Sequence, residues 1–264
     1  MKDTFKRSCE HWSEKSRNEM QNFYTLASVD YKYLAEKFEW KKWFEVHQAN
    51  VGERRLKLLD VACGSGKFPS ALVQYAKLSD AKILPVEYGL LDPSSFSLAE
   101  TRKVLRFPFE VSSEFETTLQ EFSCEQGAYD IIWATHALYA VPKHELKDAL
   151  KRLIFGMDKA GFIAHATEKS HYLKFYRCYL NGFKNGFGEP YSTAEQIVKI
   201  LKEMEVTPTA EQRAKYQPSQ AKVDVDSLRD CLVAFDLKQQ GFRNVEIGGQ
   251  FLVGQDELDE LVRD

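Results

Sequence analysis

Short apolar runs alternate with amphipathic stretches through the middle of the chain. The run YDIIWAT at 129–135 is apolar almost throughout, which is typical of a strand buried on both faces of a parallel sheet. Four more runs have the length of strands: 54–60, 86–92, 107–111 and 160–167. Apolar residues recur at helical spacing in the segments between them, 68–78, 94–105 and 142–154. This alternation predicts an α/β fold with a doubly wound, mostly parallel sheet of Rossmann-like type.

The two ends of the chain have different patterns. Residues 1–50 carry apolar side chains near helical spacing and predict a helical N-terminal cap on a main domain spanning 51–264. The segment 181–240 begins glycine-rich and then has helical character at 193–204 and 225–240, so we expect a lid or an inserted helical segment there. The stretch GFRNVEIGGQFLVG at 241–254 predicts a hairpin that closes the sheet.

The loop LDVACGSGKF at 59–68 is the first candidate for chemistry. Asp60 ends the first expected strand, and Ala62, Gly64 and Gly66 are small enough for a ligand to approach the backbone. The following helix offers free N–H groups at its start. In open parallel sheets, ligands bind beyond the carboxyl ends of the strands. The pattern therefore indicates a cofactor site, with either a dinucleotide or S-adenosylmethionine as the ligand.

The spacing of the loop distinguishes these two cofactors. In the dinucleotide pattern G-x-G-x-x-G, the third glycine would fall on Pro69. An acid placed ahead of the glycines, as Asp60 is here, suits a ligand that carries an ammonium group. Asp92, at the end of the second expected strand, can accept hydrogen bonds from both ribose hydroxyls. These features favour S-adenosylmethionine.

Three segments, LKLLDVACGSGKF, GLLDPSS and YDIIWATHALYAVP, resemble the class I S-adenosylmethionine-dependent methyltransferases. The resemblance covers about residues 55–168 and includes several motifs in the expected order. It implies a sheet of the seven-stranded type, S-adenosylmethionine as the cofactor and methyl transfer as the activity.

A narrower resemblance links LLDPSSFSLAETRKVL, SSEF and YDIIWATHALYAVPKHELKDALKRLI to the histamine N-methyltransferase group, which methylates small amines. It implies cofactor contacts at Ala62, Gly64, Asp92, Ser97, Ser112 and Thr135. It places Asp30 where the group has a substrate-binding glutamate, and Tyr172 and Tyr176 where tryptophans line the amine pocket. Because the acid is shorter and tyrosines replace tryptophans, the acceptor need not be histamine.

Four residues are candidates for the acceptor side of the site. His136 follows the fourth expected strand and could position the substrate or remove a proton, because an unperturbed histidine titrates near neutrality. The alternative is a loop histidine bonded to backbone. Tyr139 could act beside it or be a core aromatic. Tyr24 and Asp30 could hold an amine by cation–π contact and charge, or be a packed tyrosine and a solvated acid. His165, within the fifth expected strand, is interpreted as a core histidine.

Three functions stay open. Methylation of an amine on a small molecule comes first, O-methylation of a carboxylate or hydroxyl compound second, and a non-catalytic cofactor-binding module third. The net charge of −3 and the absence of a Lys/Arg tract disfavour a nucleic-acid partner. No stretch resembles a signal peptide or a membrane span, so we expect a cytoplasmic protein. Five scattered cysteines predict neither a metal site nor disulfides. The sequence leaves open whether the protein is a monomer or a homodimer.

Overall fold

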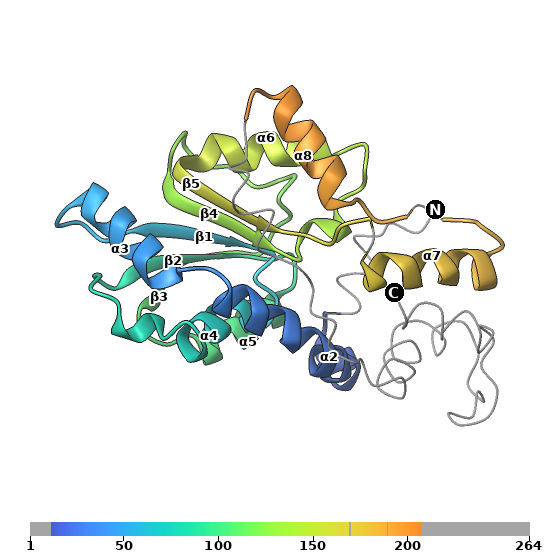
Figure 1. The fold of residues 1–264 in the computed structure, drawn as a ribbon, viewed down its shortest axis with the longest axis horizontal. Helices are drawn as coiled ribbons and strands as arrows, with labels where there is room; N and C mark the ends of the chain where they lie inside the picture. The colour runs from blue at the N-terminus through green and yellow to red at the C-terminus, as the bar shows by residue number, and fades with distance from the viewer. Residues whose placement is uncertain (1–11, 169, 189, 207–264) are drawn as a thin grey trace.

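A computed structural model describes residues 12–168, 170–188 and 190–206 of the chain (Figure 1). Its centre is a five-stranded parallel sheet in the order β3-β2-β1-β4-β5. The strands are β1 (Lys57–Val61), β2 (Val86–Leu91), β3 (Phe109–Phe115), β4 (Tyr129–Thr135) and β5 (Met157–Ala164). The expected parallel α/β architecture is therefore confirmed. The hairpin expected at 241–254 and the helix expected at 225–240 lie outside the described residues.

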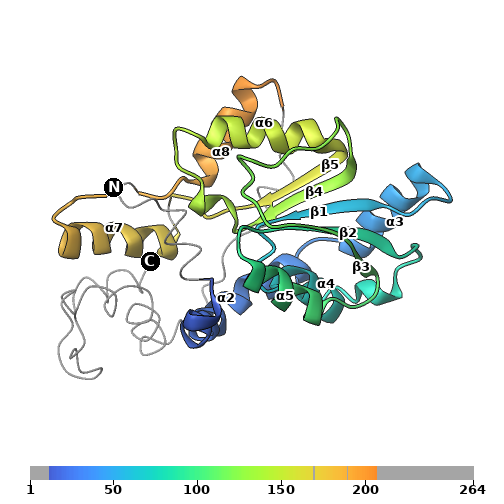
Figure 2. The same cartoon turned by 180° about the vertical axis from the view of Figure 1, so that it is seen from behind.

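Helices cover both faces of this sheet. They are α2 (Arg17–Glu36), α3 (Trp40–Val51), α4 (Lys67–Gln74), α5 (Ser95–Val104), α6 (Leu146–Gly156), α7 (His171–Lys184) and α8 (Ala194–Glu203). Helices α3, α4 and α5 lie on one face, and α6 and α8 on the other (Figures 1 and 2). Helix α7 lies beyond the carboxyl ends of the strands in both views, and α2 runs from beside α4 towards this end. The turns η1 (Glu14–Ser16), η2 (Leu78–Asp80) and η3 (Leu138–Ala140) are 3-10 helices.

The strand order creates a switch point beside β1. This strand pairs with β2 on one side, where Asp60 is level with Leu90, and with β4 on the other, where it is level with Trp133. The chain runs outward from β1 to β3 and then returns to place β4 on the opposite side of β1. In open sheets of this kind, ligands bind at such a switch point, beyond the carboxyl ends of the strands.

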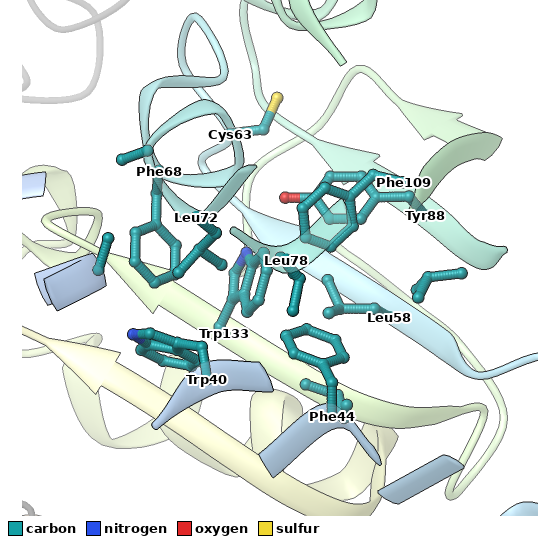
Figure 3. Close-up of a cluster of buried hydrophobic side chains, with 14 of the residues drawn as sticks. Trp40, Phe44, Leu58, Cys63, Phe68, Leu72, Leu78, Tyr88, Phe109 and Trp133 are labelled. Carbon is teal, nitrogen blue, oxygen red and sulfur yellow. The ribbon is translucent and has the colours of Figure 1, made fainter. Parts of the chain in front are cut away.

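The face covered by α3 and α4 holds an aromatic core (Figure 3). The Trp133 ring of β4 lies 5.0 Å from the Phe68 ring of α4 and 6.2 Å from the Phe44 ring of α3. Trp40 is 1% exposed and packs 5.3 Å from Phe68. Truncating a buried ring of this kind costs about 3–5 kcal/mol. The N-terminal 50 residues therefore have two roles, because α3 and the end of α2 complete this core while Tyr24, earlier in α2, lies next to the loop after β1.

Some boundaries differ from the sequence expectation. Strand β3 continues through the polar residues 112–114, which an edge strand accommodates because one side of it is open to solvent. Strand β5 ends at Ala164, so His165 lies just after it rather than within it. Helix α7 was not anticipated. Helix α8 packs its Ile197 and Leu201 into the core against α6, so this part of 181–240 belongs to the main domain.

Candidate functional site

The glycine loop turns sharply after β1. Ala62, Gly64 and Gly66 have φ values of 52°, 57° and 66°, in the left-handed region that favours glycine. The loop is anchored by the Cys63 N–H, which donates to the Leu91 carbonyl at 3.2 Å, and by the Gly66 N–H, which donates to the Cys63 carbonyl at 3.0 Å. The first bond ties the loop to the end of β2, and the second closes a turn within the loop.

The two glycines have different surroundings. A Cβ added to Gly66 would lie 2.6 Å from Val104 Cγ2 and 3.2 Å from Thr101 Cγ2, so this glycine allows α5 to pack against the loop. A Cβ added to Gly64 would lie 3.0 Å from the Tyr24 hydroxyl and no closer than 3.9 Å to any other group. Gly64 therefore presents bare backbone towards Tyr24 of α2.

Asp92 connects the loop to the end of β2. The Gly64 N–H donates to its Oδ2 at 3.0 Å, and the Ser94 N–H donates to its Oδ1 at 2.9 Å. Burial raises the pKa of Asp92 to about 6, although these two bonds and the nearby Ser97 hydroxyl lower it. A carboxylate has about four lone-pair positions, so Asp92 can still accept hydrogen bonds from a diol. The structure thus brings Gly64, Asp92 and Ser97 together.

Asp60 lies beneath the loop. Its Oδ2 accepts a hydrogen bond from the Tyr88 hydroxyl at 2.7 Å, and its side chain shares the aromatic core with Trp133. Burial raises its pKa to about 7, although the bond from Tyr88 and the nearby Trp133 indole lower it. A direct contact between Asp60 and a ligand ammonium stays a prediction. The geometry shows that the Asp60 carboxylate is buried and bonded to Tyr88 of β2.

A second group of candidates lies after β4 and β5. Thr135 is the last residue of β4 and is 7% exposed. The next residue, His136, has a φ of 54°, and its N–H donates to the Ala164 carbonyl at 2.8 Å. Its Nδ1 lies 3.4 Å from the Tyr139 hydroxyl, whose oxygen accepts a hydrogen bond from the Ala166 N–H at 2.7 Å. The structure therefore unites His136 and Tyr139, as expected.

The chemistry of His136 differs from the expectation of a histidine that titrates near neutrality. Burial lowers its pKa to about 4, so the imidazole is uncharged at physiological pH. Its Nε2 is buried and has no hydrogen-bond partner among the described residues. A base this weak is poorly suited to deprotonating an ammonium group. The neutral His136 imidazole is suited to making one hydrogen bond, as donor or as acceptor, to a bound methyl-acceptor molecule.

Several aromatic side chains surround His136. The Tyr31 ring of α2 meets it edge-on with ring centres 5.6 Å apart, and His165 stacks on Tyr139 at 3.9 Å. Tyr191 lies 5.6 Å from Tyr139 and stacks on Tyr176 of α7 at 4.0 Å. Tyr176 is therefore connected to this cluster, and its contact with an amine stays a prediction. Tyr172 lies in α7, but its side chain is outside what the structure describes.

The sequence interpretation missed Tyr31 and Tyr191 and gave His165 only a packing role. Tyr31 is seven residues after Tyr24, a helical spacing that places both on one face of α2 and could have identified it. Tyr191 lies in a loop and carries no local signal. The His165 Nε2 donates to the Ser192 carbonyl at 2.9 Å, whereas its Nδ1 is buried without a partner in the described part of the chain.

The remaining candidates are distributed differently. Tyr24 lies over the glycine loop rather than beside His136. Asp30 directly precedes Tyr31 in α2, and burial raises its pKa to about 6. Ser112 is exposed at an irregularity in edge strand β3, before the strand reaches its carboxyl end. The structure therefore does not bring Ser112 to the other candidates, and its contact with adenine stays a prediction.

Two findings concern the described residues as a whole. None of their helices has both the length and the apolar character that a membrane crossing requires. None of their His, Cys, Asp and Glu side chains form a group of three or more that could hold a metal ion.

Comparisons with known proteins give the fold a name. Neither the protein-family models nor the curated proteins include a match to this sequence. Magnesium protoporphyrin IX methyltransferase from Synechocystis PCC 6803 with bound S-adenosylhomocysteine matches with a TM-score of 0.54 at 16% identity, over 76% of this chain and 88% of that chain.

Two further solved structures are similar. The same Synechocystis enzyme with bound S-adenosylmethionine matches with a TM-score of 0.51 at 14% identity, over 77% of this chain and 86% of that chain. A possible histamine N-methyltransferase from Thermotoga maritima gives a TM-score of 0.44 at 16% identity, over 73% of this chain and 78% of that chain. The glycine loop, the strand order and the Synechocystis structures together show that this chain has the class I fold of the S-adenosylmethionine-dependent methyltransferases.

Proposed function

We propose that this protein transfers the methyl group of S-adenosylmethionine to a small molecule, with an amine nitrogen as the first candidate acceptor. The observation that carries the proposal is Asp92, buried at the end of β2 and bonded to the Gly64 N–H of the loop. An acid in this place suits the ribose diol, and the bare backbone of Gly64 suits the close approach of a ligand. The residues present therefore fit this cofactor.

S-adenosylmethionine supplies a methyl group already activated by a sulfonium. The protein therefore has to bind, orient and exclude water, because a nucleophile held in near-attack geometry needs little more. Asp92 would hold the ribose, and the loop would support the methionine end. His136 would orient the acceptor through its unpartnered Nε2. Tyr31 and Tyr139 would help to exclude water around it.

The charges around the acceptor side support an amine. Burial raises the pKa of Asp30, and no lysine or arginine of the described residues lowers it. None contributes to the pKa of His136 either. An acid of this kind at the acceptor would favour a positively charged molecule, which ionic attraction and cation–π contact with tyrosines would hold. A carboxylate acceptor would call for a basic group in the same place.

O-methylation is the second candidate, and one observation favours it. If the Tyr139 hydroxyl donates to the His136 Nδ1, the ring proton is on Nε2. An Nε2–H group would then donate to an oxygen of a bound hydroxyl or carboxylate compound. The third possibility, a cofactor-binding module without catalysis, would keep Asp92 and the loop but methylate nothing.

Calorimetric titration with S-adenosylmethionine and S-adenosylhomocysteine tests the proposal. We expect micromolar binding to the wild type and a loss of about 100-fold in affinity in Asp92→Ala, because charge-assisted hydrogen bonds to the ribose are removed. Asp92→Asn keeps an acceptor for the Gly64 N–H and separates loop disorder from lost ribose contacts. Asp80→Ala, at an exposed acid, is the matched control.

Absence of binding to folded wild-type protein would refute the cofactor assignment. Once binding is established, a panel of amines, phenols and carboxylates assayed for transfer of labelled methyl distinguishes the candidates. Binding without transfer to any compound would favour the non-catalytic module.

A further inference from the structure

Helix α2 lies over the glycine loop, with the Tyr24 side chain next to Gly64. The Tyr24 hydroxyl would be only 3.0 Å from a Cβ at Gly64, so even one carbon atom on that backbone is crowded. Tyr24 is 7% exposed, and its hydroxyl lies next to Ser65 of the loop. The Lys67 ammonium lies 4.9 Å from the centre of its ring. A ligand that reaches Gly64 from this side has to pass Tyr24.

A second set of contacts fastens the start of α2 to α5. Arg17 donates to Glu100 from Nη1 at 2.9 Å and from Nη2 at 3.2 Å, and it also pairs with Glu14 at 2.7 Å. Its guanidinium lies 4.8 Å from the centre of the Phe96 ring. At the residue that directly precedes α5, the Ser94 hydroxyl donates to the Trp12 carbonyl.

These contacts join the N-terminal stretch to the two segments that would bind the cofactor. Tyr24 contacts the loop after β1, whereas Arg17 and Trp12 contact the segment that follows Asp92 after β2. The N-terminal stretch 12–24 therefore spans the place where a ligand bound by both Gly64 and Asp92 would lie. Partly exposed ion pairs are weak and are screened by salt, so the ion pair between Arg17 and Glu100 can break.

We propose that the stretch 12–24 is a latch, which releases Arg17 and Tyr24 to admit the cofactor and refastens over it. This inference rests on the proposed function, because the cofactor is the ligand that the latch admits. Opening of the latch limits the rate at which the cofactor enters and leaves. Weakening the Arg17 contact therefore speeds both association and dissociation and changes affinity less than it changes either rate.

The test measures dissociation of radiolabelled S-adenosylhomocysteine into an excess of unlabelled ligand, with affinity from calorimetry. We expect Arg17→Met to speed dissociation about 3- to 10-fold, with a smaller change in affinity. Raising the salt concentration should speed wild-type dissociation and have less effect on this variant. Arg102→Met is the matched control, because Arg102 is on the same helix as Glu100 but pairs with Glu114 of β3.

A second variant keeps the test informative if Arg17→Met fails to fold. Tyr24→Phe keeps the ring and removes the hydroxyl over Gly64, and it should also speed dissociation. Equal dissociation rates in wild type, Arg17→Met and Tyr24→Phe, with normal melting temperatures, would overturn the latch while leaving the proposed function intact. If folded wild type does not bind S-adenosylhomocysteine, the proposed function fails and the latch fails with it.

Discussion

The carboxyl ends of β1 and β2 differ in kind from those of β4 and β5. At the first pair, backbone N–H groups, two glycines and Asp92 form a closed set of hydrogen bonds. At the second pair, stacked rings from separate segments surround His136, and two histidine nitrogens lack partners among the described residues. The ends of β1 and β2 would select a ligand mainly through backbone geometry. The ends of β4 and β5 would select one mainly through side chains. Side chains can change without altering the fold, which explains why the cofactor is easier to infer than the acceptor.

The largest expected effect tests whether the loop is a rigid backbone structure. Gly66→Ala should lower the free energy of unfolding by about 3 kcal/mol, because a Cβ at a positive φ would also clash with Val104 and Thr101. Urea denaturation measures this loss. Gly52→Ala is the control, since Gly52 has a φ of 71° but open space around it, and should cost about 1 kcal/mol. Equal losses in the two variants would mean that packing at Gly66 contributes little.

The second prediction concerns the acid beneath the loop. The pKa of Asp60 is raised to about 7 in the folded protein, so its ionisation opposes folding as pH rises from about 4 to 7 and beyond. Asp60→Asn should therefore increase the free energy of unfolding by about 2 kcal/mol at pH 8, and the gain should disappear near pH 4. Chemical denaturation at both pH values checks this. A variant destabilised at pH 8 would show that the carboxylate is itself needed.

A third prediction tests the acceptor side. Burial raises the pKa of Asp30 to about 6, and only its ionised form can attract an ammonium group. For an amine acceptor, kcat/KM should fall about tenfold per pH unit below pH 6. Asp30→Asn should lower kcat/KM at pH 8 and remove this step from the profile. A profile that keeps its step in Asp30→Asn would assign the step to another group, with Asp92 the first alternative.

The smallest expected effect lies at the edge of the sheet. Ser112→Ala should change the affinity for S-adenosylhomocysteine less than twofold, because the exposed hydroxyl is in an edge strand away from the loop. Calorimetry measures this directly. A tenfold loss would support the adenine contact that the sequence resemblance implied. The cofactor part of the site would then extend from the ends of β1 and β2 to β3.

Residues near the middle of the sheet could be predicted well from the sequence. The run 129–135 matches β4 because a strand buried on both faces must be apolar, and the glycine loop was located by its small residues and its acids. The burial of the Asp60 side chain inside the core was not predicted from the sequence. Period-two alternation along β1 puts it on the same face as Leu58, inside the core, although its position in the motif suggested contact with a ligand.

Contacts between distant segments could not be predicted. His136 and Tyr139 were selected from one motif and Tyr176 from the aromatic pair, but Tyr191 joins them only because the chain folds back after α7. Tyr24 was assigned to the acceptor, whereas the packing of α2 places it over Gly64. Such positions depend on how helices dock at the end of the sheet, and local sequence patterns carry little of that information.

The packing around Gly66 has a consequence for how this motif is inherited. Because α5 rests against Gly66, a descendant that lost its cofactor would still be selected to keep this glycine for the sake of folding. Gly64 has no comparable neighbour apart from the tip of Tyr24 and could drift once ligand binding ceased to matter. Among related sequences, Gly66 would therefore mark shared ancestry of the fold, and Gly64 together with Asp92 would mark lineages in which the site is still in use.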